Sequence, residues 1–318
     1  MSEKKGYKLN MESQNTTYHI CTTNADFQLS CESTTDLPFE MVSGKEISTI
    51  FYSYSIDGKE YYDDMGKDPA ARGDFYQQLR AGKFSTTTQV NNFRYTEYFR
   101  ALLEKGDVLH IAFTSGLTPS VYNAIAAAKT LQEEYPHRKI IVVDSMAGSF
   151  GYGLLMLRAA EMRDAGATME EIADWIRAKG TSVHHCFYVA DLTTLKKGGR
   201  ISGTSAKIAT VLGICPVIRL DLSGHLKAHK KVRGKKSAMK ALIDEMLEHA
   251  TNGANHSETC IIGHADAPED AEAVRLMIED AFPNLAGKVL VHPLGPVLVS
   301  HCGIGPVAVF FMGDKRDE

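Results

Sequence analysis

The chain has no long apolar run and few cysteines for its length. Its 318 residues include six cysteines, which are scattered and form no C-x-x-C pair, so neither a disulfide scaffold nor a structural zinc site is expected. No apolar run approaches the roughly 20 residues of a membrane-spanning helix, and the first twenty residues lack the apolar core of a signal peptide. We therefore expect a cytoplasmic protein without stable membrane insertion, in which residues 1–20 form a polar, partly disordered lead-in.

Motifs for nucleotide and metal chemistry are also missing. Neither G-x-G-x-x-G nor H-E-x-x-H occurs. Residues 234–237 (GKKS) resemble the end of a phosphate-binding loop, but Lys230 stands where that loop needs its first glycine. Residues 147–151 (AGSFG) resemble the serine elbow of hydrolases, but Ala147 replaces the first glycine. We therefore expect no cofactor and no metal site.

The charge is small overall but unevenly spread. The formal net charge is −4, yet the segment from Leu222 to Ile243 has no acid and seven cations: Lys227, Lys230, Lys231, Arg233, Lys235, Lys236 and Lys240. A solvated face, a site for an acidic partner or phosphorylated ligand, and a nucleic-acid surface all fit such a run. Because no aromatic residues interleave these cations, as a single-strand binder would need, we expect no nucleic-acid partner.

The hydrophobic pattern of the predicted strands changes near residue 180. Up to that point, apolar strands such as 107–113 and 139–143 alternate with helical segments, which predicts an α/β domain (residues 21–180) with a parallel, doubly wound sheet. Residues 47–56 read as one strand before a hairpin at Asp57-Gly58. From 181 to 318 the strands alternate apolar and polar residues, which predicts an α+β domain with a mostly antiparallel sheet.

Four segments carry polar groups that suit ligand binding. The turn at residues 113–117 (FTSGL) ends a strand and begins a helix, so its amides suit an anion, or simply a helix cap. The hydroxyls of 85–88 (STTT) suit either a cap or a carboxylate. Residues 196–202 (KKGGRIS) form either a solvated turn or an anion-docking site, and His301, on a glycine turn, is either structural or a donor to a carboxylate.

Together these segments resemble the DegV family, the fatty-acid-binding subunits of bacterial fatty acid kinase and their relatives. The resemblance runs from about Phe27 to Met312 and is carried by seven motifs in order: 32–38 (ESTTDLP), 87–89 (TTQ), 114–122 (TSGLTPSVY), 144–145 (DS), 191–201 (DLTTLKKGGRI), 231–234 (KVRG) and 301–305 (HCGIG). The chain departs from the family pattern at Glu32, Val90, Ser120-Val121 and Cys215. We expect these departures to affect the pocket and the choice of partner and to leave the fold intact.

The resemblance implies a carrier that is not catalytic alone. A long-chain fatty acid would lie in a tunnel between the domains, its carboxylate held by Thr87, Ser115 and His301, with Thr88 and Gly116 beside them. A separate ATP-dependent kinase subunit would phosphorylate that carboxylate for phospholipid synthesis. The partner-docking residues would be Arg200, Lys231 and Arg233. The alternative is a lipid ester hydrolase in which Ser115 is the nucleophile and His301 the base.

Overall fold

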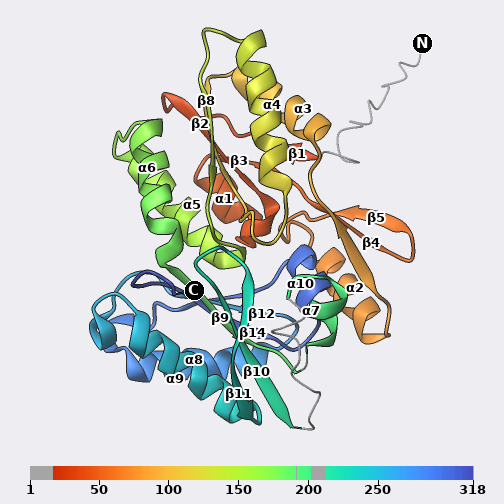
Figure 1. Ribbon diagram of the computed structural model, residues 1–318, viewed down its shortest axis with the longest axis vertical. Coiled ribbons are helices and arrows are strands. Elements are labelled where there is room, and N and C mark those ends of the chain that lie inside the picture. The colour runs from red at the N-terminus through yellow and green to blue at the C-terminus, as the bar shows by residue number, and fades with distance from the viewer. Residues whose placement is uncertain (1–16, 191, 202–212, 318) are drawn as a thin grey trace, which may run out of the picture.

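The computed structural model describes residues 17–190, 192–201 and 213–317. These residues form three β-sheets and ten α-helices. The strands of the first two sheets all precede residue 145, and those of the third all follow residue 180. The division expected near residue 180 therefore separates the sheets, and the two parts lie one above the other in Figure 1.

The first sheet is parallel apart from one short edge strand. Its order is β1-β3-β2-β7-β8, in which only β1 is antiparallel to its neighbour. The strands are β1 (Tyr18–His19), β2 (Phe27–Glu32), β3 (Ile47–Ile50), β7 (Asp107–Ala112) and β8 (Ile140–Asp144). The end of the expected polar lead-in is thus part of the sheet, whereas residues 1–16 lie outside the described residues.

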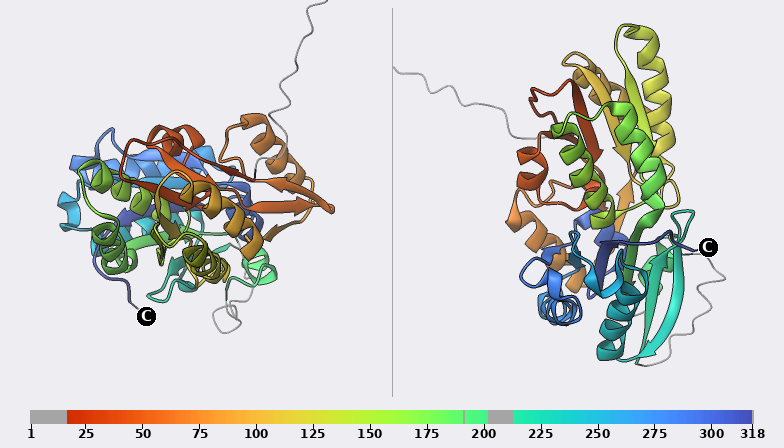
Figure 2. Two further views of the ribbon diagram at one scale, coloured as in Figure 1. Left: turned by 90° about the horizontal axis from the view of Figure 1, so that it is seen from above. Right: turned by 90° about the vertical axis from the view of Figure 1, so that its left-hand side faces the viewer.

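Helices cover both faces of this sheet, as the right-hand view of Figure 2 shows. α3 and α4 pack around Val108 on one face, and α5 and α6 pack around Leu109 and Ile111 on the other. The helices of this part are α1 (Phe39–Gly44), α2 (Pro69–Arg80), α3 (Asn92–Leu103), α4 (Ser120–Glu134), α5 (Ser149–Asp164) and α6 (Met169–Lys179). The predicted doubly wound parallel sheet is confirmed.

A second, small antiparallel sheet interrupts this pattern. It consists of β4 (Ser53–Ile56), β5 (Lys59–Tyr62) and β6 (Ser85–Thr88), in the order β5-β4-β6. The prediction of one strand over residues 47–56 is wrong, because the chain leaves the first sheet after Ile50. The backbone of Tyr52 makes its hydrogen bonds outside the first sheet. Its amide donates to Ser33 Oγ at 3.0 Å, and its carbonyl accepts from the amide of Asp63 at 2.9 Å.

The third sheet is antiparallel except at one edge, which confirms the prediction for the second half. Its order is β11-β10-β9-β14-β12-β13, and only β12 and β13 run parallel. The strands are β9 (Val183–Tyr188), β10 (Ile214–Leu220), β11 (Leu226–Arg233), β12 (Ile261–His264), β13 (Leu290–Pro293) and β14 (Val307–Met312). α8 (Lys235–His249) and α9 (Pro268–Ala281) cover one face, and α5 packs on the other.

Two short helices of the second half face the first half. α7 (Thr193–Lys197) and α10 (Pro296–Cys302) contact each other, and α10 also packs on β4 and β6. His301 therefore lies in the last turn of a helix and not on the glycine turn that the sequence suggested. Ser300 Oγ donates to Ser85 Oγ at 2.7 Å and fixes α10 against β6. No helix in the described part of the chain has the length and apolar character needed to cross a bilayer.

A pair of buried carboxyl groups holds the first turn of α10. Asp36 accepts hydrogen bonds from the amide of Gly295 at 3.0 Å and from Ser149 Oγ at 2.5 Å. A methyl group on Gly295 would lie 2.6 Å from Asp36 Oδ1 and 3.1 Å from Asp63 Oδ2, so both carboxyls pack against this glycine. Burial raises the pKa of Asp36 and of Asp63 to about 7.

These raised pKa values predict a stability that falls as the pH rises. Between about pH 4 and pH 7 the folded protein holds protons that the unfolded chain has released, so stabilisation present at low pH is lost as the pH passes about 7. Asp63→Asn should raise the free energy of unfolding at pH 8 by on the order of 1–2 kcal/mol, with little change at pH 4.5. Denaturant titrations at both pH values measure this. The exposed neighbouring change Asp68→Asn is the control, and an equal effect at both pH values would contradict the account.

Candidate functional site

A cavity lies between the two halves, at the carboxyl ends of the parallel strands. Its empty volume is about 940 Å³, including the open mouth. Thr34 follows β2, Tyr52 follows β3, and Phe113 follows β7, and all three line it. In open α/β sheets ligands collect at this edge, where the strand order changes direction.

Most of the cavity wall is apolar. The first half supplies residues from the turn after β7, and the second half supplies the rest from α7, α10 and the face of the third sheet opposite to α8 and α9. The apolar lining residues are Phe113, Leu117, Phe187, Leu195, Leu220, Leu226, Leu294, Val297, Leu298, Cys302, Pro306, Ala308 and Phe310. This wall suits a long hydrocarbon chain, because each methylene transferred from water contributes about 0.8 kcal/mol.

One hydrogen bond across the two halves marks a polar end of the cavity. Thr87 Oγ1 on β6 lies 2.8 Å from His301 Nε2 on α10, and both residues line the cavity. His301 Nδ1 is buried and has no hydrogen-bond partner among the described residues. Burial, assisted by the positive charge of Arg200, lowers the pKa of His301 to about 4, so the imidazole is neutral at physiological pH.

Arg200 also belongs to the cavity wall. Its guanidinium donates to the carbonyl of Leu117 at 3.3 Å and to that of Gly198 at 2.5 Å, which ties the second half to the turn after β7. The sequence pointed to Arg200 only as a docking residue. Its position beside His301 also places a positive charge where an anionic group of a ligand would lie.

The turn after β7 uses its amides internally and does not leave them free for an anion. The amide of Phe113 donates to Glu32 at 2.6 Å, that of Ser115 to Asp144 at 3.2 Å, and that of Gly116 to Thr114 Oγ1 at 3.1 Å. The expectation of an open anion site at these amides is therefore wrong. Two carboxylates and a hydroxyl take the donors that a ligand would need.

Three of the predicted contact residues lie off the cavity wall. Thr88 is exposed on the face of β6 opposite to Thr87, because neighbouring strand residues alternate. Gly116 packs so closely on the hairpin after β10 that a methyl group there would lie 2.3 Å from the carbonyl carbon of Gly224. Ser115 is half-buried in the same turn, and its hydroxyl has no hydrogen-bond partner among the described residues. A contact between Ser115 and a ligand stays a prediction.

The pair of residues considered for ester hydrolysis is not assembled. His301 Nε2 is hydrogen-bonded to Thr87 and not to Ser115, and no acid partners its Nδ1 among the described residues. A nucleophile–base pair needs the first contact, and its orienting group needs the second. This geometry favours a binding site.

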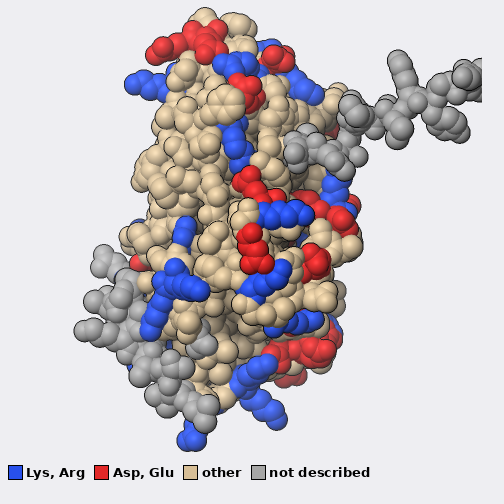
Figure 3. Space-filling model, turned by 90° about the vertical axis from the view of Figure 1, so that its right-hand side faces the viewer, with Lys and Arg blue, Asp and Glu red and all other residues tan. Residues whose placement is uncertain are grey.

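Most cations of the basic segment are paired with acids that lie outside the segment. Lys227 pairs with Asp221, Lys230 with Glu245, Lys235 with Asp270 and Lys240 with Asp244. On the face shown in Figure 3, Lys and Arg side chains are interspersed with Asp and Glu. The excess of positive charge seen in the sequence is therefore largely compensated in the fold.

Lys231 and Arg233 are exposed and have no ion pair with a described residue. They flank Val232, which packs against the core under α8, so their side chains point to the opposite face of the sheet. That face carries the cavity and the α7 segment with Arg200. The three predicted docking residues thus share one face of the third sheet.

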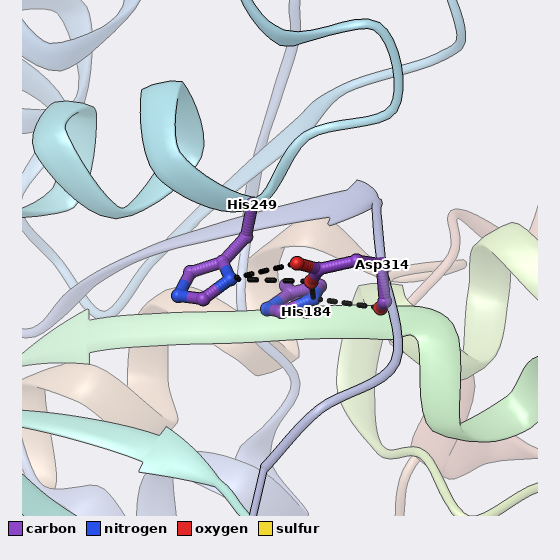
Figure 4. A group of neighbouring side chains, drawn as sticks. All are labelled: His184, His249 and Asp314. Atoms are coloured by element: carbon purple, nitrogen blue, oxygen red, sulfur yellow. Dashed lines mark hydrogen bonds and ion pairs between the residues drawn. The ribbon is translucent and has the colours of Figure 1, made fainter.

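One cluster of His and Asp side chains lies outside the cavity (Figure 4). His184 Nε2 and His249 Nδ1 each lie 3.1 Å from Asp314 Oδ1, and Arg219 lies 3.3 Å from His249 Nε2. Because Arg219 can only donate, Nε2 of a neutral His249 accepts and Nδ1 carries the proton that bonds Asp314. His184 Nε2 likewise faces two acceptors, the Asp314 carboxylate and carbonyl. The two imidazole nitrogens that face Asp314 therefore both carry a proton, and the cluster holds the C-terminal segment to β9 and α8.

The sequence did not single out Thr34, Tyr52 or Gln89 as site residues, although all three line the cavity. Thr34 and Tyr52 each lie two residues beyond the end of a parallel strand. The rule that ligands bind at the carboxyl edge would have found them if the break between β3 and β4 had been recognised.

Comparisons with known proteins identify the family to which the chain is similar. The model of the DegV family, whose members are described as uncharacterised proteins, matches residues 27–314. A DegV domain-containing protein of Clostridium perfringens is 35% identical over 92% of this chain and 99% of its own length. A fatty-acid-binding DegV protein of Thermus thermophilus has a TM-score of 0.78 and 27% identity, over 91% of this chain and 100% of that one. A DegV lipid-binding protein of Thermotoga maritima shares the fold, with a TM-score of 0.78 at 24% identity over 92% of this chain and 100% of that one. This chain therefore belongs to the DegV family.

Proposed function

We propose that the protein binds one long-chain fatty acid and presents its carboxylate to a separate ATP-dependent kinase. The observation that carries the first part is the cavity itself, which is apolar along most of its wall and has the Thr87–His301 pair and Arg200 together at one end. The fatty acid bound by the Thermus thermophilus relative supports the same ligand class.

The acyl tail supplies most of the affinity in this proposal. A long chain contributes on the order of 10 kcal/mol before costs, at about 0.8 kcal/mol per methylene. Loss of overall freedom and ordering of the chain subtract several kcal/mol or more. The polar end therefore sets the orientation of the ligand. Arg200 supplies a permanent charge, and the Thr87–His301 pair supplies one hydrogen-bond donor, because the other proton of the pair is used in the bond between the hydroxyl and the neutral imidazole.

The kinase step requires a second protein. The sequence has no nucleotide-binding loop, so ATP would be bound by the partner. In the proposed reaction a carboxylate oxygen forms a bond to the γ-phosphorus of ATP, ADP leaves, and the acyl phosphate enters phospholipid synthesis. Lys231 and Arg233, exposed on the same face of the third sheet as Arg200, are the proposed docking residues.

Thr87→Val should weaken binding of a long-chain fatty acid by about tenfold or more, because a hydrogen bond to an ionised group contributes about 1.5–3 kcal/mol. Valine keeps the branched shape that suits β6. Displacement of a fluorescent fatty acid measures the change. Thr88→Val, one residue along on the exposed face, is the matched control. Unchanged binding by Thr87→Val, or equal weakening by both variants, would contradict the assignment.

Ser115→Ala tests the remaining proposed carboxylate contact. If the free hydroxyl of Ser115 reaches the ligand, the same titration should show a several-fold loss of affinity. Wild-type affinity in this variant would restrict the carboxylate site to Thr87, His301 and Arg200. The assay is run on protein stripped of lipid, so that residual ligand does not mask the effect.

Charge reversal at Lys231 and Arg233 should slow acyl-phosphate formation by the kinase roughly tenfold, because exposed charges at an interface mainly set the rate of association. Fatty acid affinity should not change. The measurement is the rate of ADP release at several salt concentrations. Lys129→Glu, an exposed lysine on α4, makes the same charge change elsewhere. A double variant that couples to the kinase as the wild type does would refute this docking surface.

A further inference from the structure

Tyr52 occupies a fixed position at the polar edge of the first sheet. Its backbone is held between Ser33 Oγ and the amide of Asp63, at 3.0 and 2.9 Å. β2 and β3 are parallel, with Glu32 opposite Ile50 in the last paired position. Tyr52 and Thr34 therefore each stand two residues beyond that pair, at the carboxyl ends of neighbouring strands.

Both side chains line the cavity and carry an unused hydroxyl. Tyr52 is 3% exposed and Thr34 is 1% exposed. Neither Tyr52 Oη nor Thr34 Oγ1 has a hydrogen-bond partner among the described residues. Buried hydroxyls are nearly always paired, and leaving one unpaired costs free energy. Two such groups in the wall of one cavity indicate that a ligand supplies the missing partner.

The phenol of Tyr52 is suited to donate a hydrogen bond. Burial, with the negative charge of Glu32, raises its pKa well above the usual value, while hydrogen bonding of the ionised phenol to Ser120 and Thr118 lowers it. No described group lies in hydrogen-bonding geometry with Tyr52 Oη, Glu32 included, whose oxygens accept from the Tyr95 hydroxyl and the Phe113 amide. The phenol therefore stays protonated and needs an acceptor.

Thr87, Gln89 and Thr118 are polar residues of the same cavity, and the strand pairing relates them to Tyr52. Gln89 follows the strand of Thr87, and Thr118 Oγ1 donates to Gln89 Oε1 at 3.3 Å. β6 pairs with β4, which begins one residue after Tyr52, and Ser53 lies opposite Thr88. Tyr52 is thus at the Thr87 end of the cavity and not at its apolar end.

We propose that Tyr52 Oη donates a hydrogen bond to the carboxyl group of the ligand and so makes the site selective for free fatty acids over fatty alcohols. This inference rests on the proposed function. A carboxylate has about four acceptor positions on two oxygens, enough for the one donor left by the Thr87–His301 pair and for Tyr52, whereas an alcohol has a single oxygen. Loss of the phenol hydroxyl should therefore affect the acid much more than the alcohol.

The test compares hexadecanoic acid and hexadecanol on lipid-free wild type, Tyr52→Phe and Tyr188→Phe. Tyr188 is a matched control, because its side chain is buried in the core on the other face of the third sheet. Its hydroxyl donates to Asp270. Tyr52→Phe should bind the acid about tenfold more weakly and the alcohol within about twofold of wild type. Tyr188→Phe should bind both ligands as the wild type does.

Thermal unfolding separates a binding role from a structural one. Tyr52→Phe removes an unpaired hydroxyl, so the lipid-free variant should have an unchanged or higher Tm, whereas Tyr188→Phe should have a lower one. Wild-type affinity for the acid in Tyr52→Phe, or an equal loss of acid and alcohol, would overturn this inference alone. If the wild type bound neither ligand, the proposed function would fail and the inference with it.

Discussion

The hydrogen bond between Thr87 and His301 joins the two halves of the molecule at the polar end of an otherwise apolar cavity. Everything else in the site depends on the placement of these two side chains. Thr87 is carried by a small antiparallel sheet that leaves the main sheet after Ile50, and His301 by a helix of seven residues from the other half. Neither element has an extensive core of its own, so contacts across the two halves must hold the pair together.

Those contacts are polar and buried. α10 is fixed at its start by Asp36 and Asp63 around Gly295, and near its end by Ser300 on Ser85. Arg200 ties the α7 segment to Leu117 on the opposite side of the cavity. A neutral imidazole between these anchors donates or accepts according to its tautomer, while the guanidinium keeps its charge. In the proposed complex, an apolar tail would provide the binding energy and a few fixed groups would set the direction of the head.

The sequence predicted the fold better than the site. Strand–helix alternation and the apolar strands gave the parallel sheet, and the switch to alternating strands gave the antiparallel one. Three short elements were not predicted from the sequence. β12 and β13 have four residues each, and α10 has seven. The break at Tyr52 was missed because residues 47–56 keep a strand-like pattern while hydrogen bonds to Ser33 and Asp63 redirect the chain.

At the site, the hydroxyl run and the histidine were found because their residue types suit a carboxylate, and the fold places Thr87 and His301 in contact. The turn after β7 misled the prediction for a physical reason. A strand-to-helix turn usually offers its amides to an anion, but here the side chains of Glu32, Asp144 and Thr114 accept from them. Glu32 and Asp144 come close to the turn only in the tertiary structure. Similarly, the basic segment looked unpaired because its acidic partners lie elsewhere in the chain.

The central claim is that the cavity holds a fatty acid, and native mass spectrometry tests it most directly. The purified protein would be weighed under native and then denaturing conditions, and the lost component extracted and identified. The account predicts one mass difference, equal to a single long-chain fatty acid, and a reduced occupancy in Thr87→Val. No bound lipid after incubation with a mixture of fatty acids would contradict it.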